Sequence, residues 1–216
     1  MKISLSILDM DFADLRTSLK QFETSGIDSF HMDIMDGNFV DNISFGPGIV
    51  RTVHEISPLT LHSHLMITEP GRFVGRFFDA GSASVTVHVE SLNEGNMSVL
   101  ERNNIGLSLN PDVPVECLFP YLHKVNRILI MSVNAGYGGQ EFIESSLDRI
   151  SMLASKRKGS GSDYIISVDG GINLHNACKC MEAGADELVV GSYITKAENP
   201  TTVIAGLKSV MCKDIS

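Results

Sequence analysis

The sequence is short of positive charge. It has 17 Lys and Arg residues against 26 Asp and Glu residues, a formal net charge of −9. Non-specific nucleic-acid binding needs a positive face, and docking on anionic lipid needs basic clusters, so this balance argues against both partners. An anionic substrate must then be held by local dipoles or by a metal ion, because the global field does not attract it.

Long apolar runs and metal-site cysteine patterns are also missing. No stretch reaches the roughly 20 apolar residues that span a bilayer, and the short apolar run near Met1 does not resemble a secretory signal. We therefore expect a cytoplasmic protein. The four cysteines are Cys117, Cys178, Cys180 and Cys212. Cys178 and Cys180 lack the usual spacing of a zinc site, so we expect reduced thiols.

The chain has no composition break that would mark a domain boundary. Only residues 156–162 (KRKGSGS) look flexible, and they are too few for an interdomain linker. Eight β-rich runs alternate with amphipathic segments. The expected strands are 2–8, 30–35, 59–66, 84–88, 106–109, 128–132, 164–169 and 187–190. The expected helices are 12–24, 47–56, 72–80, 114–122, 143–156, 173–183 and 200–211, with a weaker one at 92–103 that contains Gly95.

This alternation predicts an α/β fold, a (β/α)8 TIM barrel formed by one domain at residues 1–216. The length of 216 residues and the 43% hydrophobic content suit a single core of that size. A doubly wound open sheet is the alternative. It normally has fewer strands, and the G-x-G-x-x-G motif that often follows its first strand is absent. Asp11, Ser146 and Asn173 are candidates to begin helices.

Polar side chains gather where the expected strands end, which is where a barrel of this type places its active site. Residues two apart on a strand share a face, so His31 and Asp33 point the same way. With His64 and Asp169 they form a set of two nitrogen and two oxygen ligands. Such a set suits one divalent ion, Zn, Fe(II), Mn or Co. Two buried carboxylates without a cation would be costly.

Two other histidines, His62 and His88, also fall on expected strands, but their positions do not point to one role. We expect His62 to be a hydrogen-bonded core residue. For His88, a core residue and a wall of the site both remain open. His54, His123 and His175 fall on helices or their edges, and we expect them to be solvated.

Glycine-rich loops follow the last three expected strands, at 134–140, 169–171 and 191–192. Glycines let the backbone approach a ligand and present bare N–H groups, and the late loops of a barrel often bind phosphate. None of these loops contains Lys or Arg. We therefore expect a phosphate to be held mainly by neutral backbone dipoles.

Several segments together resemble the ribulose-phosphate 3-epimerase family. They run in order along nearly the whole chain, and the second and fifth are quite specific in combination. The segments are 6–12 (SILDMDF), 31–37 (HMDIMDG), 42–47 (NISFGP), 64–66 (HLM), 131–142 (MSVNAGYGGQEF), 168–172 (VDGGI), 183–186 (AGAD) and 191–192 (GS).

The resemblance implies a barrel of the ribulose-phosphate-binding type with one divalent metal. Its ligands fall on His31, Asp33, His64 and Asp169, and its two acid/base carboxylates on Asp33 and Asp169. The substrate and phosphate contacts fall on Ser6, His64, Gly136, Tyr137, Gly138, Gly139, Asp169, Gly170, Gly171, Gly191 and Ser192. The methionines that line the site fall on Met35, Met66 and Met131. The sequence departs from the family pattern at Asp9, Asn38, Asp41 and Ala135.

The implied activity is metal-dependent 3-epimerisation of a ketose phosphate, first of all D-ribulose 5-phosphate to D-xylulose 5-phosphate. Two carboxylates would move protons on and off an enediolate, in a homo-oligomeric enzyme. Residues 1–4 and 121–124 also resemble allulose-6-phosphate 3-epimerases, so a six-carbon substrate stays open. A Schiff-base aldolase would need a lysine at a strand end, and none is present. A metal-dependent aldolase and a non-catalytic sugar-phosphate-binding barrel are the remaining alternatives.

Overall fold

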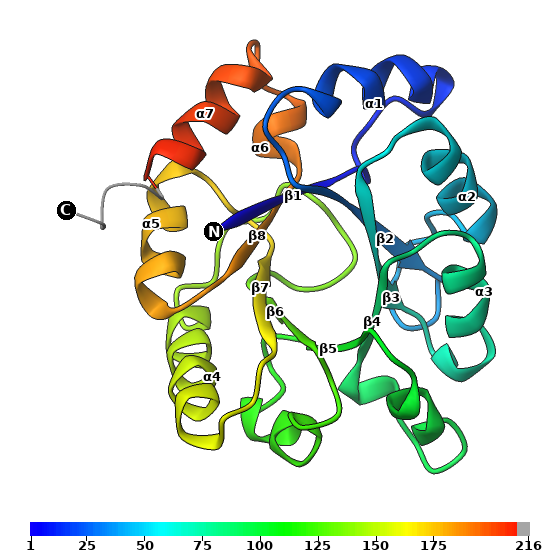
Figure 1. Ribbon diagram of the computed structural model, residues 1–216, viewed down its shortest axis with the longest axis vertical. Coiled ribbons are helices and arrows are strands. Elements are labelled where there is room, and N and C mark those ends of the chain that lie inside the picture. The colour runs from blue at the N-terminus through cyan, green and yellow to red at the C-terminus, as the bar shows by residue number, and fades with distance from the viewer. Residues whose placement is uncertain (211–216) are drawn as a thin grey trace.

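Eight parallel strands close into a barrel in the order β1 to β8, each paired with its neighbours in the sequence and β8 with β1. Our computed structural model describes residues 1–210, and Figure 1 looks along the barrel with the helices around it. The strands are β1 (Lys2–Ser6), β2 (Ser29–Met35), β3 (Thr60–Met66), β4 (Ser84–His88), β5 (Ile105–Leu109), β6 (Arg127–Met131), β7 (Ile165–Asp169) and β8 (Glu187–Val190). The predicted (β/α)8 barrel is therefore confirmed.

The helices lie on the outside of the strands. They are α1 (Leu15–Glu23), α2 (Pro47–Ile56), α3 (Val74–Asp79), α4 (Ser146–Ser160), α5 (Leu174–Ala183), α6 (Ser192–Thr195) and α7 (Pro200–Val210), with 3-10 segments η1 (Phe12–Asp14), η2 (Pro70–Arg72), η3 (Val89–Ser91), η4 (Met97–Glu101) and η5 (Val115–Tyr121). The amphipathic helices turn an apolar stripe to the barrel, as α1 does with Leu15, Leu19 and Phe22. Strands β2, β4, β5 and β6 are buried along their whole length, because helices cover one face and the barrel interior the other.

Two expected helices are only 3-10 segments. Residues 92–103 contribute η4 and residues 114–122 contribute η5. Pro120 inside η5 has no N–H to donate, which disfavours an α-helix there. The short α6 was not expected, since four residues carry no periodic pattern.

The expectation that residues 156–162 are flexible was wrong for most of that stretch. Helix α4 continues to Ser160, and Gly161 ends it in the left-handed conformation at φ 67°. Ser146 lies inside the first turn of α4 and does not cap it. Asn173 does cap α5, and Asn176 completes a capping box with it.

A polar cluster fills the N-terminal end of the barrel. The side chains of Arg127 and Glu187 are 7% and 1% exposed and form an ion pair, and Arg127 also donates to Ser167 Oγ. His62 Nδ1 lies 2.7 Å from Ser84 Oγ, and its Nε2 faces Arg127. Burial and the charge of Arg127 lower the pKa of His62 to about 3. His62 is thus neutral and hydrogen-bonded as expected, but it is half-buried and not a core residue, and it lies at the opposite end of the barrel from the polar strand ends.

No helix among residues 1–210 is long and apolar enough to cross a bilayer. Within the same range, Cys117, Cys178 and Cys180 are free thiols. Cys212 and the predicted last helical residue, Met211, lie outside the described residues.

Candidate active site

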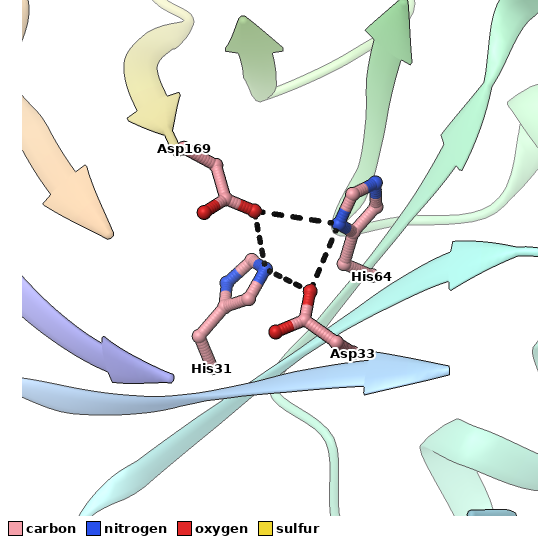
Figure 2. Close-up of side chains that lie close together, drawn as sticks. All are labelled: His31, Asp33, His64 and Asp169. Carbon is pink, nitrogen blue, oxygen red and sulfur yellow. Dashed lines mark hydrogen bonds and ion pairs between the residues drawn. The ribbon is translucent and has the colours of Figure 1, made fainter. Parts of the chain in front are cut away.

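Strand register brings the predicted ligands to one level of the barrel. Asp33 on β2 pairs with His64 on β3, and His31 lies two residues before Asp33 on the same face. Asp169 ends β7, where it pairs with Met131 of β6. Figure 2 shows the four side chains of His31, Asp33, His64 and Asp169 reaching toward one another from three strands.

The four side chains are close enough to hold one ion. His31 Nε2 and His64 Nδ1 lie 3.3 and 3.2 Å from Asp33 Oδ1, and 3.6 and 3.7 Å from Asp169 Oδ2. All four ligand atoms fall within 4.8 Å of one another. Tetrahedral ligands about 2.1 Å from an ion are about 3.4 Å apart. The four His–Asp distances are close to this spacing, so small shifts of the side chains would let all four bind one first-row divalent ion.

His31 gives a second indication of a cation. Its Nε2 atom is buried and has no hydrogen-bond partner within the described residues. Buried polar atoms are normally paired, because an unpaired one has lost its water without compensation. A metal ion among the four ligands would satisfy this nitrogen. The donor set and the unpaired nitrogen therefore fit the divalent ion that the sequence predicts.

The two carboxylates have opposite electrostatic surroundings. Burial and the nearby charge of Asp33 raise the pKa of Asp169 to about 7. Burial also disfavours the charged form of Asp33, but His31 and His64 outweigh it and hold the pKa of Asp33 below its usual range. Ser6 Oγ adds a hydrogen bond of 2.7 Å to Asp33 Oδ2. Near neutral pH, before any ion is bound, Asp33 is thus ionised, whereas Asp169 is close to the midpoint of its titration and can carry a proton.

The two histidines differ as well. Burial opposes the charged form of His31, yet the attraction of Asp33 raises the pKa of His31 above its ordinary value. Burial lowers the pKa of His64 to about 4, although Asp33 acts in the other direction. His64 is therefore a neutral imidazole at pH 7, the form that binds metals.

A cavity of about 440 Å³ opens above the cluster. Asp33 and Asp169 line it, whereas His31 and His64 do not and are almost completely buried. Met35 and Met66 pack together on one wall, and Met131 belongs to a separate apolar cluster. The volume is in the range of small-molecule sites. The remaining predicted contacts on its lining are Ser6, Gly136, Tyr137, Gly138, Gly139, Gly170, Gly171, Gly191 and Ser192.

The three glycine loops meet on one side of this cavity. Among the hydrogen bonds of residues 1–210, none is donated by the backbone N–H of Gly138, Gly139, Gly170 or Gly171. Gly171 has a φ of +64°, and a Cβ there would lie 2.6 Å from the backbone nitrogen of Phe142, so no other residue fits without rearrangement. The loops that line the cavity thus keep several backbone N–H donors without an internal acceptor, as an anion site requires.

Lys196 and Glu90 are two charged residues near the site that the sequence analysis did not single out. Lys196 lines the cavity just after α6, with its Nζ 3.6 Å from Asp9 Oδ2. Lys196 follows the third glycine loop closely in the sequence, but its contact with Asp9 depends on α6, which was not expected. Glu90 and Asn110 belong to a hydrogen-bonded network that reaches the cluster through His88.

The four departures from the family pattern are not equivalent. Asp9 lines the cavity, whereas Asn38, Asp41 and Ala135 do not. The backbone N–H of Ala135 donates to Asn110 Oδ1 at 3.3 Å, a bond that proline could not make. The carbonyl of Asp41 accepts a hydrogen bond from the Tyr137 hydroxyl. Asp9 is therefore the departure that bears most directly on the ligand.

The chain matches a family model described as the ribulose-phosphate 3 epimerase family over residues 2–195. It is 40% identical to the chloroplastic ribulose-5-phosphate-3-epimerase of Arabidopsis thaliana over 96% of this chain and 76% of the relative. It is also 40% identical to the ribulose-phosphate 3-epimerase of Bacillus subtilis, over 89% of this chain and 91% of that protein.

Solved structures of other enzymes share the fold. One is 3-hexulose-6-phosphate synthase from Salmonella typhimurium, with a TM-score of 0.70, 18% identity and 98% coverage of both chains. Another is orotidine 5'-phosphate decarboxylase from Pyrococcus horikoshii, with a TM-score of 0.73, 16% identity, and coverage of 97% of this chain and 98% of that one. At such identities the likeness concerns the barrel alone.

Proposed function

Since the chain belongs to the ribulose-phosphate 3-epimerase family, and is therefore an isomerase, we propose that it interconverts D-ribulose 5-phosphate and D-xylulose 5-phosphate at the cavity above His31, Asp33, His64 and Asp169. The observation that carries the proposal is the pair of carboxylates, Asp33 and Asp169, that line one cavity with oppositely shifted pKa values.

Asp33 and Asp169 act as the proton carriers. The ionised carboxylate removes the proton from C3 of the ketose, and the electron pair of the C–H bond moves into an enediolate. The protonated carboxylic acid then delivers its proton to the opposite face of C3, which inverts that carbon. The roles exchange in the reverse direction. Ser6 holds Asp33 in place through its 2.7 Å hydrogen bond, and the methionines keep water from the reacting carbon.

His31, Asp33, His64 and Asp169 are the residues that would hold one divalent ion, which we propose to be Zn, Fe(II), Mn or Co. When bound, such an ion supplies Lewis-acid stabilisation of negative charge on the substrate oxygens. The neutral state of His64 and the ionised state of Asp33 prepare both ligands for it. Elemental analysis of protein purified without chelator should find close to one ion per chain.

The phosphate is assigned to the glycine loops. Gly138, Gly139, Gly170 and Gly171, whose N–H groups donate no hydrogen bond within the described residues, line the cavity together with Gly191 and Ser192. Neutral dipoles can hold a dianion in a protein of net charge −9 without a cluster of cations. The cytoplasmic location and the homo-oligomeric state stay predictions.

The test is exchange of the C3 hydrogen in D2O, followed by NMR with each epimer supplied in turn to metal-saturated protein. If each carboxylate serves one face, Asp33→Asn and Asp169→Asn each keep exchange from one epimer and lose conversion to the other. Loss of a general acid or base typically lowers the rate about 10²–10⁴-fold. Asp163→Asn, the same change at an exposed aspartate, is the control. Wild-type epimerisation by either site variant would refute the two-carboxylate mechanism.

A coupled assay fixes the substrate. Ribulose 5-phosphate and allulose 6-phosphate are compared by kcat/KM in the same preparation. We expect the five-carbon sugar to have the higher value. A higher value for allulose 6-phosphate would make the six-carbon sugar the substrate of the same reaction. If neither sugar exchanges its carbon-bound hydrogen with solvent, the protein is not an epimerase.

A further inference from the structure

A line of side chains leads from the metal cluster through two buried histidines on β3 and β4 to Glu90, whose side chain is 21% exposed. His64 presents Nδ1 to the cluster, and its Nε2 lies 2.9 Å from His88 Nε2. His88 Nδ1 in turn lies 3.5 Å from both carboxylate oxygens of Glu90. The side chains of His64 and His88 are both 0% exposed. The described residues offer no other hydrogen-bond partner to His64 Nε2 or to His88 Nδ1.

The protons along this line can be counted from Glu90 inward. A carboxylate only accepts hydrogen bonds, so the nitrogen of His88 that faces Glu90 must carry hydrogen. In a neutral imidazole the other nitrogen, His88 Nε2, is then a lone pair. That lone pair can be paired only by a hydrogen on His64 Nε2. His64 Nδ1 is left as the lone pair, and it points into the cluster.

Glu90 and His88 are held firmly in these positions. The backbone N–H of Asn110 donates to Glu90 Oε1 at 2.8 Å, and the charge of Arg149 lies close enough to interact with Glu90. Phe39 packs against the His88 ring with centroids 4.8 Å apart. The Ser91 hydroxyl donates to the His88 carbonyl. The His88 ring therefore has little freedom to turn, and Glu90 sets its orientation.

We propose that Glu90 and His88 are positioning residues that keep the proton of His64 on Nε2, so that its Nδ1 lone pair is always directed at the metal. The inference rests on the proposed metal site. Neither His88 nor Glu90 lines the cavity. The proposal therefore assigns a role to the end of β4 and the segment after it, which do not contact the substrate directly. Without this line, His64 could place its hydrogen on Nδ1 and donate to Asp33, 3.2 Å away, and would then be unable to bind an ion.

The direct test is the position of these hydrogens in the zinc-loaded protein, by two-bond ¹H–¹⁵N correlation spectra of ¹⁵N-histidine. The seven histidines are few enough to assign by substitution. We expect hydrogen on Nδ1 of His88 and on Nε2 of His64, with His64 Nδ1 shifted by zinc. Hydrogen on His88 Nε2, alone or on both nitrogens, would overturn the inference, because His88 could then not accept from His64.

The second test is zinc affinity, by competition with a chelator of known affinity. Second-shell changes typically cost 10–100-fold in metal affinity, and we expect that loss for Glu90→Ala and His88→Phe. Glu90→Gln should lose less, because its amide oxygen still accepts from His88. Glu94→Ala, at an exposed glutamate nearby, is the matched control and should bind zinc as the wild type does.

Melting of the metal-free proteins separates positioning from packing. A positioning role lowers zinc affinity in Glu90→Ala while the metal-free melting temperature stays within a few degrees of wild type. Unchanged affinity in both variants would refute the inference even if His88→Phe melts earlier. The two proposals fail differently: wild-type protein that binds no zinc contradicts the metal site, whereas tight binding by wild type and both variants contradicts only the positioning role.

Discussion

Asp169→Asn should stabilise the metal-free protein at high pH while it destroys activity. Burial and the charge of Asp33 raise the pKa of Asp169 from an ordinary value of 3.8 to about 7. The folded chain therefore binds this proton more tightly than the unfolded chain does. Between about pH 4 and 7 the unfolded state has lost the proton and the folded state keeps it, so stability falls as pH rises through that window. Asparagine cannot ionise, so the variant should not lose this stability as the pH rises.

The magnitude follows from the shift. A change of about 3 pKa units at about 1.4 kcal/mol each gives an upper limit of about 4 kcal/mol above pH 7. The attraction between Asp169 and a protonated His31 disappears in the variant and offsets part of this gain. We expect Asp169→Asn to be more stable than wild type by about 2–4 kcal/mol at pH 8, and by much less at pH 4.

The assay is urea unfolding followed by circular dichroism, in chelator, from pH 4 to 8. Asp163→Asn serves as the control for an exposed aspartate and should show no such pH-dependent difference from wild type. A stability difference for Asp169→Asn that does not grow with pH, or a variant less stable than wild type at pH 8, would refute the reasoning. With metal added the order should reverse, because the wild type then gains the fourth ligand.

Three further predictions concern the cavity and the polar cluster at the N-terminal end of the barrel. Gly138→Val should raise KM for the phosphorylated ketose about 10–100-fold, as expected for one lost hydrogen bond to a charged group, because a Cβ there already meets Asp9 Oδ2 at 2.8 Å; an unchanged KM would remove this loop from the phosphate site. Lys196→Ala should raise KM by at most about fivefold, because a side chain that is 67% exposed contributes only weakly through its charge. Asp9→Ser should lower KM. Both effects should shrink in high salt, which steady-state kinetics at two ionic strengths will test. Arg127→Met should lower the free energy of unfolding by about 3–5 kcal/mol, because Glu187 would be left buried without its partner. Adding Glu187→Leu should recover much of this loss, as measured by urea unfolding. Equal losses in the single and double variants would show that the unpaired charge is not the cause.

The sequence by itself predicted the barrel, the metal-ligand set and the phosphate loops. Period-two alternation fixes which side chains share a strand face, so His31, Asp33 and Met35 could be grouped without a structure. The positions of strand ends are also local information, because glycines and caps follow them. The 3-10 segments η4 and η5 and the end of α4 were misjudged, since boundaries depend on packing as well as on propensity.

Only the tertiary structure decided which neighbours surround each residue, and so how residues of the same type differ in their electrostatics. Asp33 and Asp169 are both aspartates at strand ends, yet neighbours from other strands lower the pKa of one and raise that of the other. His62 and His64 are two residues apart on one face of β3, but the first meets Arg127 at the N-terminal end of the barrel and the second meets the carboxylates. The contacts of His88 with His64 and of Lys196 with Asp9 join distant segments. A pKa and a hydrogen-bond partner depend on atoms within a few ångströms in space, and closing the barrel determines which atoms those are.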